Sequence, residues 1–253
     1  MLRKLWFIAL TSLPLWAGAQ SLSVRADQWM PVNGKPDDAG AEGLYIDILR
    51  AVAKDSGTRI DYQLQGWTDA VKAAQAGTVD CVVGAAKEDA PGLRFAARPW
   101  LVGHTAWYRG VDRTEIRAET VAELAKFKLG VIGGYAYGAD IDPLIAAQPA
   151  DKLESVTSSR DPLNAVVMRL VTGRIDLALE TDFVMQAKLR SMQLADRIVQ
   201  AGRSEVETEI YFACNNNPRV ASFMQAVDAW IDARRADGTL AAFYAPYGLD
   251  KPE

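Results

Sequence analysis

The sequence is poor in the residues that many metalloenzymes and hydrolases need. Its 253 residues include one histidine, His104, and two cysteines, Cys81 and Cys214, which lie far apart along the chain. A zinc site gathers several Cys, His or carboxylate ligands, and this set of residues does not supply one. A Ser-His-Asp or Cys-His arrangement would have to use His104, which lies outside any nucleophile motif. We therefore expect no metal site and no histidine-dependent catalysis.

Long runs of one charge and low-complexity tracts are also missing. The chain carries 28 Lys and Arg residues against 32 Asp and Glu residues, a formal net charge of −4. Nucleic-acid-binding domains usually carry a basic excess, so no nucleic-acid partner is expected. With 49% hydrophobic residues, the chain is suited to one or two globular domains.

The first residues differ in composition from the rest of the chain. Arg3 and Lys4 precede an apolar stretch over 5–16, and Ala17-Gly-Ala19 forms a small-x-small cleavage site. This order is typical of a secretory signal peptide, so we predict that residues 1–19 are cleaved and that the protein is periplasmic. The stretch is too short for a membrane anchor, and no later stretch is long and apolar enough to span a bilayer.

The two cysteines allow two interpretations. An exported protein enters an oxidising compartment, where Cys81 and Cys214 can form a disulfide. Cys81 also lies within an apolar, strand-like run over 79–83, which suits a buried free thiol. The sequence leaves both open, because a disulfide depends on a Cα separation that the sequence does not give.

Strand and helix patterns alternate along the chain after residue 20. Short apolar runs predict strands at 22–26, 59–64, 79–83, 128–132 and 175–179. Apolar residues at helical spacing predict helices that begin near Tyr45, Trp67, Pro162 and Val220, and a capping box begins another at Thr120. Such alternation indicates an α/β fold with mixed, mainly parallel sheets.

One pattern occurs twice. Residues 76–84 and 172–180 each read as a helix end, a glycine and an aspartate that leads into a buried strand. The repeat suggests two similar lobes, with Gly84 and Glu180 at the carboxyl ends of strands, where open α/β sheets bind ligands. Any α/β protein can repeat this step, so the pattern alone does not establish two lobes.

Seven short segments occur in a characteristic order. They are Gly43-Leu-Tyr-Ile-Asp47, Gly66-Trp67, Gly77-Thr-Val-Asp80, Phe95–Trp100, Leu129–Gly134, Gly173-Arg-Ile-Asp176 and Gly238-Thr-Leu240. Because these segments occur in this order, the chain resembles the family-3 extracellular solute-binding proteins, which are the polar amino-acid type of the type II periplasmic binding proteins. The resemblance covers nearly all of the chain after residue 19.

The resemblance implies a fold and a function. The fold has two Rossmann-like lobes with mixed, mainly parallel sheets joined by a two-strand hinge, near 106–109 and 206–210. Lobe one would be discontinuous, 20–107 plus 206–253, and lobe two would be 108–205. The function would be capture of a small polar ligand, an amino acid or related organic anion, by lobe closure and its delivery to a membrane ABC permease. We expect a monomer that is not an enzyme and needs no cofactor.

The arginine with which the family holds an α-carboxylate has no counterpart at the aligned position, which falls at Gly92 or Ala90. Two nearby cations are candidates to replace it, Arg94 and Lys87. Arginine offers a fork of donors that matches a carboxylate, whereas lysine supplies a point charge. Either residue could equally be a solvated surface cation.

The second lobe departs from the family in the same way. Where the family has hydroxyl residues after its glycine, Tyr135, Ala136 and Tyr137 follow Gly134. Their backbone N–H groups could still hold an anion, and the rings suit a larger or flatter ligand, unless a tyrosine packs inside the lobe.

The family uses an acidic residue to pair with the ligand's ammonium group. The aligned position in this chain is Thr181, which lies between Glu180 and Asp182. Either acid could reach a cationic ligand group, or Thr181 and Asp182 could simply begin the following helix.

Aromatic residues remain at the expected ligand positions. Trp29 follows the first strand with Asp27 beside it, and Trp67 is either a stacking ring or a core residue. The expected ligand-binding residues are Asp27, Trp29, Trp67, Ala85, Lys87, Arg94, Gly134, Tyr135, Ala136, Tyr137, Glu180 and Asp182.

Two alternatives to a transport protein remain. The fold also occurs in periplasmic enzymes resembling cyclohexadienyl dehydratase, for which Glu180 would be the candidate general acid. The chain could also be a ligand-sensing subunit that docks on a separate receptor.

Overall fold

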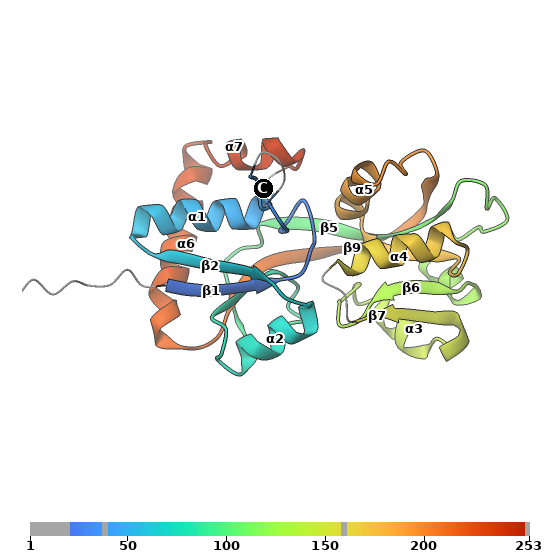
Figure 1. Cartoon of the computed structure of the whole chain (residues 1–253), viewed down its shortest axis with the longest axis horizontal. Coiled ribbons are helices and arrows are strands. Elements are labelled where there is room, and N and C mark those ends of the chain that lie inside the picture. Colours follow the sequence, from blue (N-terminus) through green and yellow to red (C-terminus); the bar gives the residue numbers. More distant parts are fainter. Residues whose placement is uncertain (1–20, 37–39, 158–160, 251–253) are drawn as a thin grey trace, which may run out of the picture.

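The computed structural model describes residues 21–36, 40–157 and 161–250. The predicted signal peptide, 1–19, lies outside the described residues. Figure 1 shows two halves connected by two long strands, β5 (Leu101–Gly110) and β9 (Ile198–Cys214). No helix among the described residues is long and apolar enough to cross a membrane.

The first half is built from both ends of the described chain. Its strands are β1 (Ser21–Ala26), β2 (Arg59–Leu64), β3 (Cys81–Ala85) and β4 (Arg94–Phe95). Its helical elements are α1 (Leu44–Ser56), α2 (Trp67–Gln75), α6 (Pro218–Ala236), α7 (Ala241–Tyr244) and the 3-10 turn η3 (Ala245–Tyr247). Strand β1 pairs in parallel with β2 and β3, while β3 and β4 pair antiparallel with β9.

The second half contains the middle of the chain. Its strands are β6 (Leu129–Ile132), β7 (Leu153–Val156) and β8 (Leu177–Thr181), and β6 lies between the other two in parallel. Its helical elements are η1 (Val121–Lys126), α3 (Asp142–Ala147), η2 (Ala150–Lys152), α4 (Pro162–Val171) and α5 (Asp182–Ser191). Strand β8 joins the crossing strands through antiparallel pairing with β5.

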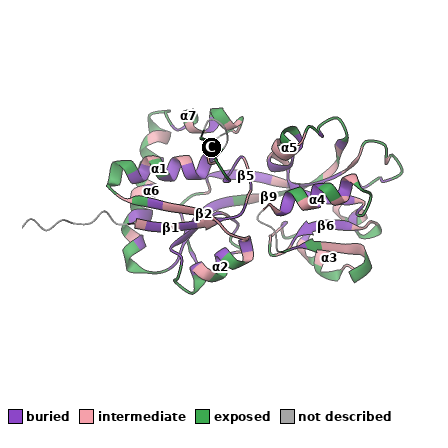
Figure 2. Cartoon of the chain, in the orientation of Figure 1, coloured by how far each residue is buried: buried purple, intermediate pink, exposed green. Residues whose placement is uncertain are grey.

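The crossing strands make one continuous mixed sheet, with the order β2-β1-β3-β9-β5-β8-β6-β7. Strands β5 and β9 pair antiparallel from Leu101 opposite Ile210 to Gly110 opposite Ile198, with register shifts between His104 and Ala106 and between Trp107 and Tyr108. Figure 2 shows the inner strands largely buried, while exposed residues lie on outer helix faces and outlying turns. The predicted α/β fold with mixed sheets in two connected parts is confirmed.

Helix boundaries follow the patterns in the sequence closely. In α1 the apolar positions at helical spacing are buried, and Gly57 ends the helix in the left-handed conformation, with φ 69°. Helix α4 occupies the predicted residues, with Pro162 in its first turn and the Asp161 side chain accepting from the Asn164 backbone N–H. The predicted capping box at Thr120 is present, but it begins the 3-10 helix η1.

Two strands begin later than their apolar runs predict. Strand β3 begins at Cys81 because the carbonyl groups of Val79 and Asp80 accept hydrogen bonds from Asn215 instead of joining the ladder. Strand β8 begins at Leu177, after the Asp176 N–H has bonded to the Lys128 carbonyl. Both strands therefore extend two residues further toward the junction between the halves than predicted.

Cys81 and Cys214 form a disulfide between the neighbouring strands β3 and β9, with their Cα atoms 3.9 Å apart. This decides between the two interpretations of the cysteines in favour of the bridge. The bond links segments that are 133 residues apart in sequence, both within the first half.

Candidate functional site

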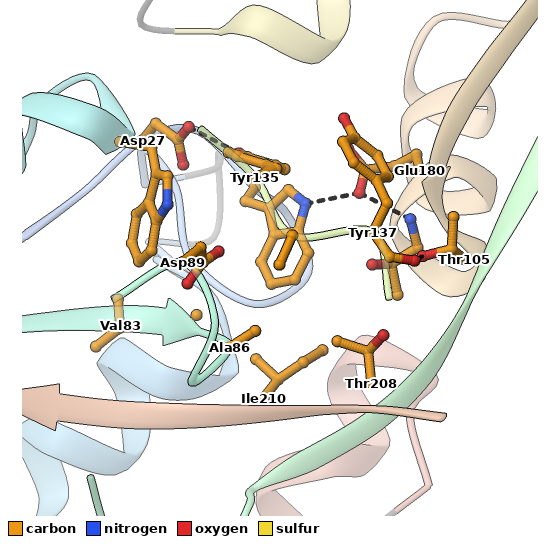
Figure 3. A pocket seen from close by; sticks show the side chains of 15 residues that line it. Asp27, Val83, Ala86, Asp89, Thr105, Tyr135, Tyr137, Glu180, Thr208 and Ile210 are labelled. Atoms are coloured by element: carbon orange, nitrogen blue, oxygen red, sulfur yellow. Dashed lines mark hydrogen bonds between the residues drawn. The ribbon is translucent and has the colours of Figure 1, made fainter. Parts of the chain in front are cut away.

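A small cavity lies where the two halves meet (Figure 3). Its walls come from the ends of β1, β3 and β8, the turn after β6, the start of α2 and the crossing strands. The cavity is about 20 Å³, which is room for about one water molecule. Its lining residues are Asp27, Trp29, Trp67, Val83, Gly84, Ala86, Asp89, Thr105, Tyr135, Ala136, Tyr137, Glu180, Thr181, Thr208 and Ile210.

The end of β1 supplies one carboxyl group and one indole. Asp27 is 3% exposed and accepts a hydrogen bond from the Tyr135 hydroxyl at 2.7 Å. Two residues later, the Trp29 indole N–H donates to Glu180 Oε1 at 3.1 Å. Because Asp27 and Trp29 belong to the first half, while Tyr135 and Glu180 belong to the second, both hydrogen bonds hold the halves together.

Gly84 is required for this arrangement. It has a φ of 79°, and a Cβ atom there would lie 3.1 Å from both the Trp29 ring and the Asn33 side chain. A larger residue at this bulge between β3 and β9 would strain the backbone and press its Cβ atom against the Trp29 ring.

Four aromatic rings surround the cavity. The Tyr135 ring meets Trp29 and Trp67 edge to face, with centroids 6.2 Å and 6.3 Å apart, and lies at a tilt to Tyr137 at 6.4 Å. Trp67 packs in the core cluster of α2 and also lines the cavity, so its core role is present, while stacking on a ligand stays a prediction. Its indole N–H has no hydrogen-bond partner.

Glu180 is the most buried acid of the cavity, with 1% of its surface exposed. Its Oε1 atom accepts from the Thr181 backbone N–H at 2.8 Å and from Trp29, whereas Oε2 has no partner. Burial raises the pKa of Glu180 to about 7, and the nearby Asp27 raises it further while these hydrogen bonds oppose the shift.

Of the other two acids, Asp27 is buried like Glu180, whereas Asp89 is partly exposed. Burial raises the pKa of Asp27 to about 7 against the lowering effect of the Tyr135 hydroxyl. Burial also raises the pKa of Asp89 well above its usual range, although backbone groups of Ala136 and Ala86 donate to it. Ala136 lies in the second half, so Asp89 also reaches across the junction, and its Oδ1 atom has no partner.

The predicted cationic residues lie elsewhere. Lys87 is exposed, lies 3.5 Å from Glu209 and rests over the Tyr211 ring. Arg94 is an exposed residue of the short strand β4, opposite Cys214. Neither lines the cavity, because the chain after β3 turns these side chains toward the surface, and no Lys, Arg or His lines it among the described residues.

Three further predicted residues have structural roles next to the cavity. Ala85 points into the core cluster under α2. Asp182 begins α5, where its carboxylate accepts from the Phe183 N–H at 2.7 Å. Gly134, with a φ of 87°, lets its turn approach α2, since a Cβ atom there would lie 2.5 Å from Thr68 Oγ1. None of the three lines the cavity.

The predicted ligand-binding set lacks eight lining residues, namely Val83, Gly84, Ala86, Asp89, Thr105, Thr181, Thr208 and Ile210. Two of these, Gly84 and Thr181, had been noted in the sequence at the end of a strand and at the aligned acidic position. Asp89 had a usable signal, because it directly precedes Ala90, one of the two positions at which the family arginine was sought. No sequence signal showed that Thr105, Thr208 and Ile210 would line the cavity. These residues lie on the crossing strands and reach the cavity through the pairing register.

Two halves, a pair of crossing strands and a cavity at the junction are the architecture of the periplasmic binding protein fold. Residues 22–90 match the family model of the bacterial extracellular solute-binding proteins, family 3. The resemblance predicted from the sequence is therefore confirmed. No curated protein matches the sequence at significant similarity.

Solved structures share the fold over nearly their whole length. A histidine kinase sensor domain with similarity to periplasmic binding proteins is 19% identical, with 93% of this chain and 98% of that chain covered and a TM-score of 0.76. The substrate-binding protein of an amino acid ABC transporter is 19% identical, covers 91% and 99%, and has a TM-score of 0.72. An ancestral amino acid-binding protein, a precursor of cyclohexadienyl dehydratase, is 19% identical, covers 90% and 95%, and has a TM-score of 0.71.

Proposed function

We propose that this protein is an exported solute-binding protein that closes around a small ligand and presents it to a membrane ABC permease. The observation that carries the proposal is the convergence of both halves on one cavity, where the Tyr135–Asp27 and Trp29–Glu180 hydrogen bonds cross the junction. The family match over 22–90 and the likeness to a transporter's substrate-binding protein support it.

In this proposal the halves act as lobes, 20–107 plus 206–253 and 108–205, that open about β5 and β9. Only these two strands continue from one half to the other among the described residues, and a few residues within such crossings can absorb a hinge motion. In the open form the ligand reaches Trp29, Trp67 and Asp27. Closure then adds contacts from the turn after β6 and from Glu180, so the ligand stabilises the closed form through contacts with both lobes.

The test uses the mature protein from residue 20 onward. A panel of amino acids, amines, sugars and organic acids is screened by thermal shift, and each hit is measured by calorimetry and by small-angle scattering. We expect at least one compound to raise the melting temperature with its concentration and to change the radius of gyration. If no compound in the panel stabilises the protein, the binding function is wrong.

A periplasmic enzyme is the second candidate. Glu180 and Asp27 both have pKa values of about 7 in the cavity, which suits general acid and base chemistry near neutral pH. The precursor of cyclohexadienyl dehydratase among the similar structures supports testing this class of reaction. Incubation with prephenate followed by product analysis separates the candidates: turnover that Glu180→Gln abolishes would replace binding with catalysis.

A sensory role shares the same ligand chemistry and differs in the partner. The likeness to a kinase sensor domain motivates it. The two roles differ in the genes expected beside this one, a permease for transport or a receptor for sensing. A second test measures ATP hydrolysis by the neighbouring permease in a membrane, because only the transport role requires that the ligand-bound protein stimulate it.

A further inference from the structure

The cavity is acidic without any compensating positive charge. The carboxyl groups of Asp27, Asp89 and Glu180 line it, and no cationic side chain does so among the described residues. Buried carboxylates are normally paired with a cation or densely hydrogen-bonded, because an isolated buried charge is costly. A cationic ligand would supply the charge that the protein itself lacks.

The hydrogen-bonding groups of the cavity indicate the same class of ligand. Glu180 Oε2, on a side chain that is 1% exposed, has no partner, and neither has Asp89 Oδ1. Once ionised, both carboxyl groups only accept hydrogen bonds, and ammonium and guanidinium groups carry only donors. The free Trp67 indole N–H is a single neutral donor, which suits a hydroxyl or carbonyl oxygen but does not neutralise a carboxylate.

The rings complete a cation-binding environment. Trp29, Trp67, Tyr135 and Tyr137 line the cavity together with the acids, and Figure 3 labels the two tyrosines beside Asp27 and Glu180. Their faces attract a positive charge, and their area accommodates an alkyl or aryl body once the lobes open and Tyr135 moves.

A carboxylate on the ligand would find no corresponding site. The turn after β6, whose backbone N–H groups were expected to hold an anion, shares the cavity wall with Asp89, since Ala136 and Asp89 both line it. When ionised, Asp89 would repel a ligand carboxylate from this turn. Arg94 and Lys87 lie outside the cavity.

We propose that the cavity binds an organic cation without a carboxylate, an amine or a guanidine, held by Asp27, Asp89 and Glu180 among the surrounding rings. This inference rests on the proposed function, since it takes the cavity as the ligand site. It replaces the expectation of an amino acid or organic anion with a ligand of opposite charge.

The test compares each amino acid with its decarboxylated amine. Calorimetry at pH 8 measures agmatine against arginine, cadaverine against lysine, putrescine against ornithine and tryptamine against tryptophan. We expect the amine to bind at least tenfold more tightly than its parent in every pair that binds. If the amino acid binds equally well or better, or if only sugars or organic acids from the panel bind, the cation proposal is wrong and the binding function stands. If nothing binds, both are wrong.

Charge-neutral variants locate the site. With the amine that binds most tightly, Glu180→Gln and Asp89→Asn should each weaken binding by at least tenfold. Asp196→Asn, which removes an exposed acid on the turn before β9, should leave affinity within twofold. Circular dichroism and melting curves confirm that each variant is folded, and unchanged affinity in folded Glu180→Gln and Asp89→Asn proteins would overturn the assignment.

Discussion

The buried acids should make the ligand-free protein less stable as the pH rises. Burial raises the pKa of Asp27 from 3.8 to about 7 and that of Glu180 from 4.5 to about 7. In the unfolded chain both groups have lost their protons at pH 5, whereas in the closed fold they keep them until about pH 7. The folded state therefore binds more protons across this window, and its stability falls as the pH increases through it.

The size of the effect follows from the pKa shifts. Each group lowers the free energy of unfolding by up to about 1.4 kcal/mol per pH unit, or about 2 kcal/mol between pH 5 and pH 7, because the slope has halved at the folded-state pKa. The two acids raise each other's pKa, and opening of the lobes would let water reach them. We therefore expect a combined loss of about 2 to 5 kcal/mol between pH 5 and pH 8, with Asp89 acting in the same direction.

The groups around these two acids also affect their pKa values. Asp27 accepts a hydrogen bond from the Tyr135 hydroxyl, which lowers its pKa, and the charge of Asp161 raises it. Glu180 accepts hydrogen bonds from Trp29 and from the Thr181 backbone, which lower its pKa. Carboxyl groups with lowered pKa values, such as Asp80 beside Arg219, act with the opposite sign and only in more acidic solution. They do not cancel the loss above pH 5.

The assay is urea unfolding of the ligand-free protein, followed by tryptophan fluorescence at constant ionic strength from pH 5 to pH 8. The double variant Asp27→Asn, Glu180→Gln should lose most of the pH dependence and should exceed the natural protein in stability at pH 8. Asp196→Asn serves as the control with unchanged slope. Equal stability of the natural protein at pH 5 and pH 8, or a full slope in the double variant, would refute the reasoning.

Three further perturbations test the junction and the bridge. Tyr135→Phe removes the hydroxyl that donates to Asp27 across the halves, so the melting temperature should fall by an amount equivalent to about 1–3 kcal/mol; an unchanged melting curve would contradict this. Gly134→Ala should lower the free energy of unfolding by about 1–2 kcal/mol, because Gly134 has a φ of 87° and its turn contacts α2. Small-angle scattering of this variant should show a more open molecule. Unaltered scattering and an unaltered melting curve would argue against this contact. The double variant Cys81→Ser, Cys214→Ser should lower the free energy of unfolding by about 2–5 kcal/mol. Urea unfolding measures this beside the natural protein with and without reductant, and an equal unfolding midpoint in all samples would exclude a stabilising disulfide.

Local patterns in the sequence were sufficient for most helices and for the class of fold. Helices α1 and α4 have apolar stripes, caps and terminal glycines within a few residues of one another, so their limits could be read directly. Strand limits depend on partners from distant parts of the chain. Asn215 determines where β3 begins, and no feature near residue 79 indicates that contact.

The candidate site was predictable only where it follows strand ends. Asp27, Trp29 and Glu180 lie at carboxyl ends of strands, so the topology alone brings them together. Thr105 and Thr208 depend on the register of β5 and β9, whose shifts are a property of the assembled sheet. Lys87 and Arg94 failed as candidates because proximity in sequence to the expected arginine does not fix the direction of a side chain in a turning loop.

The charge of the site illustrates how a shared fold can take a different ligand. An arginine in this loop would make the cavity suitable for a carboxylate, whereas this chain has Ala90 and Gly92 at the aligned positions and directs Asp89 to the turn of the second half. Asp89 therefore adds negative charge to the cavity wall that also contains Ala136, beside Asp27 and Glu180. Reversing the charge at Asp89, which lines the cavity, tests this argument. The variant Asp89→Arg should weaken amine binding by more than Asp89→Asn does, and a gain in affinity for the amine would contradict it, because a cation placed beside the cavity must oppose a cationic ligand.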